Sequence, residues 1–233
     1  MKILSPELHQ RKIVRTLGLA QILNGVGVAG TVAAGSLLVS SITKSEGLSG
    51  LAQTTSVLGA AVMALPLARL TQTGGRRLAL TFGYSVGVVG ALLAIFGGAN
   101  RSLFFMLLGV FMVGAASASG YQARFAAIDL ATPENRSKNL SFVVWGSTIG
   151  AVTGPNLMEP SGIFASSLGL PKLVGPYLIA AFTLTLSVTV IALFLKPDPY
   201  LTANKAVEGI TSKKRETVRT ALAHIREYPI ALF

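Results

Sequence analysis

Residues 145–157, WGSTIGAVTGPNL, decide the fold class of this chain. Gly146, Gly150 and Gly154 recur every four residues, so on a helix they form a smooth groove along one face. Pro155 follows at once and removes a backbone donor where the groove ends. Each interior Gly would weaken a soluble helix by roughly 1 kcal/mol, whereas in a bilayer small residues let neighbouring backbones approach closely. The stretch therefore predicts a membrane helix, and its glycines serve either close packing alone or a surface along which the helix bends.

The composition supports a membrane protein with several spans. Of the 233 residues, 51% are hydrophobic and only 12% are charged, and the mean hydropathy is +0.62. A soluble domain would carry roughly 25% charged residues. There is no Cys, and both His residues, His9 and His224, lie in charged flanks, so the sequence offers no catalytic set, no metal site and no cofactor site. An enzyme is therefore not expected.

Six apolar segments follow one another along the chain. They are approximately 13–42, 48–71, 78–98, 103–128, 140–164 and 173–195. Each has about 20 residues or more, enough to cross a hydrocarbon core of roughly 30 Å. The first has no cleavage site of the signal-peptide type and is expected to be retained as a span. The sequence predicts an all-α protein with a six-helix bundle over 13–195, preceded by an N-terminal tail at 1–12.

The basic residues predict the orientation of these spans. With the N-terminus in the cytoplasm, all of the 20 Lys and Arg residues except Lys44, Arg101 and Lys172 fall on the cytoplasmic side. Topology in the plasma (inner) membrane thus explains the net charge of +11, and a nucleic-acid partner is not expected. The expected partner is the lipid bilayer.

The composition changes after Pro197. Residues 196–216 form a basic cytoplasmic linker, which is either solvated or associated with an anionic leaflet. Residues 217–233 predict a helix that leads into a seventh span, so the chain resembles half of a larger bundle. Two small-residue runs, GVGVAGTVAAG at 25–35 and GVFMVGAASASG at 109–120, are either a chance similarity or the echo of three spans repeated with inverted topology.

Two connectors resemble those of the major facilitator superfamily (MFS). The stretch 66–77, PLARLTQTGGRR, is similar to the family's loop signature G-x-L-A-D-R-x-G-R-R and keeps Leu70, Gly75, Arg76 and Arg77. It carries Ala68, Gln72 and Thr73 at the leading Gly, the acid and the first Arg. The stretch 122–136, QARFAAIDLATPENR, looks like the loop between spans four and five, with Asp129 and Arg136 on either side of Pro133.

The opening stretch also resembles a family motif. It is similar to the fifth-span pattern G-x-x-x-G-x-x-x-G-P, which is associated with proton-driven exporters. The arginine that the family carries in its fourth span is absent, and Gly109 or a neighbour stands there. The resemblance implies the N-terminal half of an MFS transporter that works by alternating access as an efflux permease or antiporter.

A transporter needs polar groups at membrane depth, where they are costly and therefore informative. Gln21 and Asn24 are three residues apart and share a helix face, either to line the transport pathway or to bridge helices. Gln122 and Arg124 are further pathway candidates, although Arg124 also suits snorkelling to the interface or a gating ion pair.

No Asp or Glu lies in the middle of a predicted span. Glu159 comes nearest, so it is either the coupling acid of a proton-driven transporter or an exposed carboxylate at the rim. The substrate cannot be named from these residues. The alternative to a transporter is a truncated or partner-dependent six-span protein without autonomous transport, which would act only as a homodimer or beside a second six-span half.

Overall fold

The apolar runs of the sequence fold into helices. The structure is a computed structural model that describes residues 6–208, with side chains described over 9–204. Every element in this part of the chain is helical; the elements are α1 (Pro6–Thr43), η1 (Glu46–Leu48), α2 (Gly50–Ala99), α3 (Leu103–Ala126), α4 (Pro133–Asn156), α5 (Met158–Ser167), η2 (Lys172–Val174), α6 (Gly175–Phe194) and α7 (Pro199–Glu208). The packing described below lies within residues 6–202.

Four stretches of the described residues are long and apolar enough to cross a membrane. They are His9–Thr43, Glu46–Ala99, Leu103–Ala126 and Lys172–Asn204. The fold is therefore all-helical with several candidate spans, as the sequence predicts. The helix α4, which carries the opening stretch, is not among the four, because its Gly, Ser and Thr residues and its polar ends lower its hydropathy.

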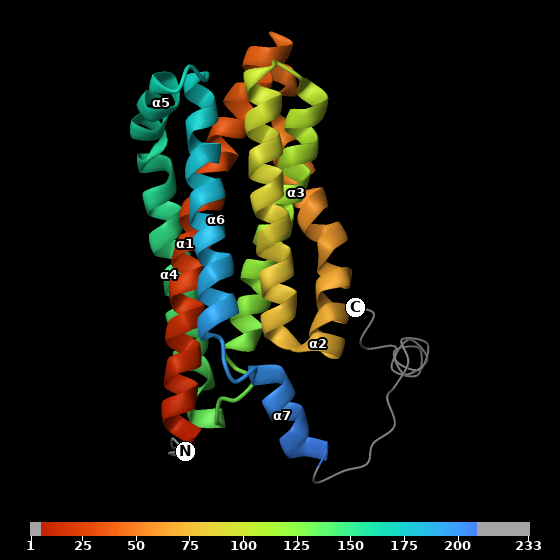
Figure 1. The fold of residues 1–233 in the computed structure, drawn as a ribbon, viewed down its shortest axis with the longest axis vertical. Coiled ribbons are helices and arrows are strands. Elements are labelled where there is room, and N and C mark those ends of the chain that lie inside the picture. The colour runs from red at the N-terminus through yellow and green to blue at the C-terminus, as the bar shows by residue number, and fades with distance from the viewer. Residues whose placement is uncertain (1–5, 209–233) are drawn as a thin grey trace, which may run out of the picture. The chain divides into compact units, whose positions relative to one another are not determined.

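The long helix α2 is broken at Gly75. This residue has φ 84° and ψ 175°, a backbone conformation that is essentially restricted to glycine. Figure 1 shows the chain turning back there, so that the segments before and after Gly75 run side by side in opposite directions. They correspond to the predicted second and third apolar segments (48–71 and 78–98). The break therefore supplies the tight connector that the loop signature led us to expect.

Small residues bring the helices close together. The helix α2 packs most extensively on α3, and α1 packs on α4 and α6. A Cβ built on Gly90 of α2 would lie 2.6 Å from the carbonyl oxygen of Gly109 on α3. One on Gly87 would lie 2.7 Å from the Ala116 Cβ. Both distances are shorter than van der Waals contact, so these interfaces leave no room for a side chain at either glycine.

The glycine groove of α4 packs against α1. A Cβ on Gly146 would lie 2.8 Å from the Gly18 carbonyl oxygen, one on Gly150 2.6 Å from the Gly25 Cα, and one on Gly154 2.8 Å from the Gly30 amide nitrogen. The run 25–35 thus supplies part of the opposing surface. The close-packing interpretation accounts for these contacts, while bending stays a prediction.

The helix is interrupted just beyond the groove. Pro155 is exposed near the end of α4, and Leu157 separates α4 from α5. The Ser161 amide donates to the Leu157 carbonyl at 3.0 Å, so the chain resumes a helix almost at once. The predicted fifth segment (140–164) therefore consists of two helices.

Large apolar side chains point outward. Trp145 and Phe104 are each 69% exposed, and Phe182 is 65% exposed. An apolar exterior over a small-residue interior is what lipid as the surrounding solvent requires.

Some boundaries differ from the predicted ones. The helix α1 begins at Pro6, inside the predicted tail at 1–12, and α7 covers part of the predicted linker at 196–216. The helix predicted at 217–233 lies outside the described residues.

Candidate functional site

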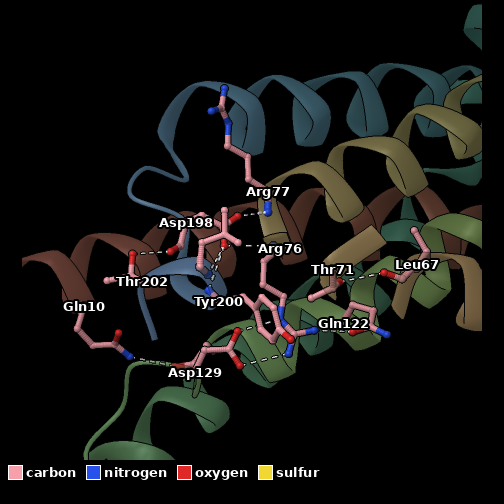
Figure 2. Close-up of polar contacts among 12 residues, drawn as sticks. Gln10, Leu67, Thr71, Arg76, Arg77, Gln122, Asp129, Asp198, Tyr200 and Thr202 are labelled. Atoms are coloured by element: carbon pink, nitrogen blue, oxygen red, sulfur yellow. Dashed lines mark hydrogen bonds and ion pairs between the residues drawn. The ribbon is translucent and has the colours of Figure 1, made fainter. Parts of the chain in front are cut away.

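The break of α2 places Arg76 at the centre of a polar network. Its Nε donates to Asp129 Oδ2 at 2.8 Å and its Nη2 to Asp129 Oδ1 at 3.2 Å, a two-point ion pair. Its Nη1 donates to Gln122 Oε1 at 2.7 Å. The Tyr200 ring lies 5.7 Å from the guanidinium carbon, within cation–π range. The side chains of Arg76 and Asp129 are only 12% and 14% exposed, so these charge-assisted bonds are sheltered from water. Figure 2 shows the network.

Asp198 is the second hub of this network. Its carboxylate accepts from the amides of Arg76 and Arg77 at 3.2 and 2.7 Å, at the start of the second α2 segment. It also accepts from the amides of Tyr200 and Leu201 at 3.0 and 3.1 Å, at the start of α7. A carboxylate is favourable at a helix N-terminus because it satisfies free amides and opposes the helix dipole. One side chain therefore holds two helix starts together (Figure 2).

Sequence reasoning missed Asp198. The signal was present, because an Asp followed by Pro199 is a common way to begin a helix. What the sequence did not contain is the second helix start, which only the fold brings to the same carboxylate.

The other loop residues are placed more simply. Arg77 Nε donates to the Ala192 carbonyl at 2.9 Å, which ties α2 to the end of α6. Gln10 Nε2 donates to the Ala127 carbonyl at 3.0 Å, which ties α1 to the end of α3. Arg136 is exposed on the first turns of α4 and is not part of the network.

A cavity of about 360 Å³ opens between α1, α3 and α4. Its lining combines small apolar residues with polar ones and comprises Gln21, Asn24, Gly25, Val28, Ala29, Ser117, Gly120, Tyr121, Arg124, Ser147, Thr148 and Ala151. Three of the four predicted pathway residues, Gln21, Asn24 and Arg124, therefore lie together. The fourth, Gln122, points instead to Arg76. Tyr121 and Ser147 were not singled out from the sequence.

The two carboxamides of this cavity are buried without partners. Gln21 is 2% exposed and Asn24 is 5% exposed. Gln21 Oε1 and Asn24 Oδ1 accept no hydrogen bond within the described residues. A buried polar group without a partner costs about 1–3 kcal/mol. Helix bridging, the alternative interpretation of this pair, is thus not seen in the described part of the chain.

Arg124 enters the cavity from α3. Its Nη2 donates to Ser147 Oγ at 3.4 Å, and its guanidinium carbon lies 5.1 Å from the Tyr121 ring centre. Its Nε has no partner among the described residues. No Asp or Glu is among the residues that line the cavity, so nothing there neutralises this charge.

Glu159 lies away from the cavity. It is exposed on the first turn of α5, and its part in coupling stays a prediction.

The sequence of this chain matches the model of a known protein family. The model of the Major Facilitator Superfamily matches residues 17–233. The chain belongs to this superfamily. The predicted resemblance is thereby confirmed, and the match is to the N-terminal half of an MFS transporter. As a member of this superfamily, the chain is a multi-pass membrane protein, and its family is one of transporters rather than of enzymes.

Three curated transporters are similar to this chain. Two are from Bacillus subtilis (strain 168): the uncharacterized MFS-type transporters YdeG, 36% identical over 86% of this chain and 47% of the relative, and YddS, 33% identical over 84% and 45%. The riboflavin transporter RfnT of Brucella anthropi is 28% identical over 67% of this chain and 41% of the relative. The chain spans less than half the length of each of these relatives.

Proposed function

We propose that this chain forms one wall of the pathway of a small-molecule transporter that works by alternating access. The observation that carries the proposal is the cavity between α1, α3 and α4, where the oxygens of two buried carboxamides lack partners. Polar groups left unsatisfied at membrane depth are costly, and a passing substrate would supply their hydrogen bonds.

The proposal places six crossings in the membrane. They are α1, the two segments of α2 on either side of Gly75, α3, α4 continued by α5, and α6. The end that carries Arg76, Arg77 and Arg136 faces the cytoplasm, because basic loops are retained on that side. The membrane is the plasma (inner) membrane.

The polar network around Arg76 and Asp198 has a role in the transport cycle. It joins the break of α2 to the turn after α3 and to the start of α7, and the bonds would have to break or re-form when the bundle opens toward the cytoplasm. We therefore assign it to stabilising one of the two alternating states.

Efflux is the proposed direction, because the groove of α4 resembles the exporter motif. The proposed coupling is to protons, with Glu159 as the candidate acid in this chain. Unchanged proton-driven transport by Glu159→Gln would remove Glu159 from the mechanism.

The second candidate is a six-span unit that transports only with a partner. It is favoured by one observation, namely that the chain covers less than half of each curated relative. The missing wall would come from a second six-span half or from a second copy of this chain.

Reconstitution into proteoliposomes tests both candidates. Efflux of a substrate panel is compared for this chain, for the chain with a second six-span half, and for the full-length coding product. Riboflavin belongs in the panel because one relative is named for it. We expect transport whenever both walls are present. If the full-length product moves no compound, the transporter proposal fails; if this chain alone transports as a monomer, the partner-dependent candidate fails.

The same assay tests the cavity. Gln21→Leu and Asn24→Leu each remove a carboxamide at nearly constant size and should reduce transport by about tenfold, the factor that about 1.4 kcal/mol represents. Gln53→Leu, which changes an exposed glutamine of α2, is the matched control. Undiminished transport by both cavity variants would mean that the substrate passes elsewhere.

A further inference from the structure

Arg124 gives the cavity an uncompensated positive charge. The only ion pair among the described residues joins Arg76 to Asp129, and no acidic side chain lines the cavity. The guanidinium has one long hydrogen bond, to Ser147 Oγ at 3.4 Å, and rests near the Tyr121 ring. Arginine carries five N–H donors in a planar fork. The Nε donor is buried, whereas the Nη end of the fork is free to meet an acceptor in the cavity.

Ser147 is a weak hydrogen-bond acceptor for Arg124. Its hydroxyl donates to the Val144 carbonyl at 2.6 Å, so only its lone pairs face Arg124. A neutral hydroxyl oxygen at 3.4 Å offers little compensation for a full charge. An oxyanion in the cavity would satisfy the guanidinium far better, because a carboxylate or a phosphate matches its two-point geometry.

The carboxamides lie on the same wall. Gln21 and Asn24 project from α1 toward Gly120 of α3, where a Cβ would lie 2.7 Å from Asn24 Nδ2 and 3.3 Å from Gln21 Nε2. Each carboxamide can both donate and accept. Together they suit a group that presents an N–H beside a C=O, such as an amide or an imide.

We propose that the substrate of this cavity is a small organic anion, whose oxyanion pairs with Arg124 and whose amide-like edge is bound by Gln21 and Asn24. The inference rests on the proposed function, since it names the substrate class of the same pathway. The cavity volume of about 360 Å³ falls within the range of roughly 300–1,000 Å³ that is typical for small-molecule sites. Cations are disfavoured because they would meet the guanidinium with no acid to balance it.

Charged thiol reagents test the charge preference without knowledge of the substrate. The chain has no Cys, so Ser117→Cys places a single thiol in the cavity wall. The measured quantity is the reaction rate of an anionic methanethiosulfonate divided by that of a cationic one. We expect this ratio to be about tenfold higher at Ser117→Cys than at the exposed control Ser167→Cys. Adding Arg124→Gln should bring the ratio down to that of the control, whereas adding Arg69→Gln, which changes an exposed arginine of α2, should leave it unchanged. A ratio that Arg124→Gln does not alter, or a Ser117→Cys thiol that reacts with neither reagent, would overturn the proposal.

Matched ligands separate this inference from the transporter proposal. Carboxylic acids and organic phosphates are compared with their uncharged amides or esters in the transport assay of the full-length product. We expect acids, phosphates or both to be transported in preference to their neutral partners, with the preference lost in Arg124→Gln and retained in Arg69→Gln. Which of the two is preferred identifies the oxyanion. Transport of neutral or cationic compounds without preference for an anion overturns the inference and leaves the transporter proposal standing; no transport of any compound defeats both.

Discussion

Two carboxylates make different contacts at the break of α2. Asp129 neutralises the side chain of Arg76, while Asp198 binds the amides of Arg76 and Arg77. The first interaction pairs a charge of α2 with one in the turn that follows α3, and the second satisfies donors that a helix start leaves free. Substituting Asp129 should therefore affect the ion pair with Arg76, whereas substituting Asp198 should affect the helix starts.

The ion pair should show a measurable coupling. Arg76→Gln and Asp129→Asn each leave a sheltered partner unsatisfied, and the double variant removes both at once. We expect a coupling free energy of about 1–2 kcal/mol between the two sites in chemical denaturation of the protein in detergent. The control pair Arg69→Gln and Asp129→Asn should be additive, because Arg69 is exposed and away from the pair. Additivity at Arg76 as well would show that the pair adds no stability.

Gly75 should tolerate no side chain. Gly75→Ala places a Cβ in a backbone region that costs about 1–3 kcal/mol and sets it 2.5 Å from Asp198 Oδ2. Gly169→Ala is the matched control, since Gly169 has φ 74° with no atom within 4 Å of the added Cβ. We therefore expect Gly75→Ala to lower the melting temperature more than Gly169→Ala does. Equal losses would mean that the Asp198 contact relaxes at no cost.

At the scale of elements, glycines form the closest contacts between α1 and α4. The glycines of α4 meet backbone atoms of α1, and the run 109–120 of α3 meets α2 in the same manner. An inverted repeat of three spans would pair the helices in this way, with the first span on the fifth and the fourth on the second. We keep the repeat as a proposal that these contacts support.

Bulk in the groove should stop transport. Gly150→Leu would push α4 away from Gly25, so we expect transport to be lost while membrane insertion persists, as judged by surface labelling of the inserted protein. Gly50→Leu, at a glycine with no atom within 4 Å of an added Cβ, is the control. Pro155→Ala separates bending from packing, because Pro155 is exposed and its loss leaves the groove intact. Reduced transport at an unchanged melting temperature would support bending, and unchanged transport would leave close packing as the whole role of the groove.

Asp198 should control the start of α7. In Asp198→Asn the amides of Tyr200 and Leu201 lose a charged acceptor, so we expect their hydrogen exchange to accelerate by about tenfold, the factor that corresponds to about 1.4 kcal/mol. Asp129→Asn, which leaves these amides bonded, should not change their exchange. Equal protection in Asp198→Asn would show that α7 begins without the cap.

At the scale of the whole molecule, α4 with α5 gives the sharpest test of six crossings, because α4 lacks the apolar composition of the other spans. If the pair crosses, an impermeant thiol reagent should label Ser137→Cys only from the cytoplasm and Ser167→Cys only from outside. Both positions are exposed. If both positions are labelled from the same side of the membrane, α4 and α5 do not cross it.

The sequence predicted the helices and their close packing well, because both depend on local composition. Six apolar segments and four-residue glycine spacing are visible without a fold. Gln21, Asn24 and Arg124, proposed from the sequence as pathway residues, all line the cavity, while their part in a transport pathway stays a prediction. Helix spacing already separates Gln122 from Arg124, because residues two apart lie on different faces, but only the fold shows that the partner of Gln122 is Arg76. Sequence reasoning also missed Asp198, whose importance depends on two helix starts that meet only in the fold.

Trp145 lies one residue before the glycine groove, is 69% exposed, and is the only tryptophan of the chain. The protein consequently carries its own optical probe on α4, the helix that we propose to move during transport. Lipids brominated at different depths quench indole emission according to proximity, so steady-state fluorescence would report where α4 sits in the hydrocarbon. A change in that quenching profile when substrate is added would make the displacement of α4 visible without any label.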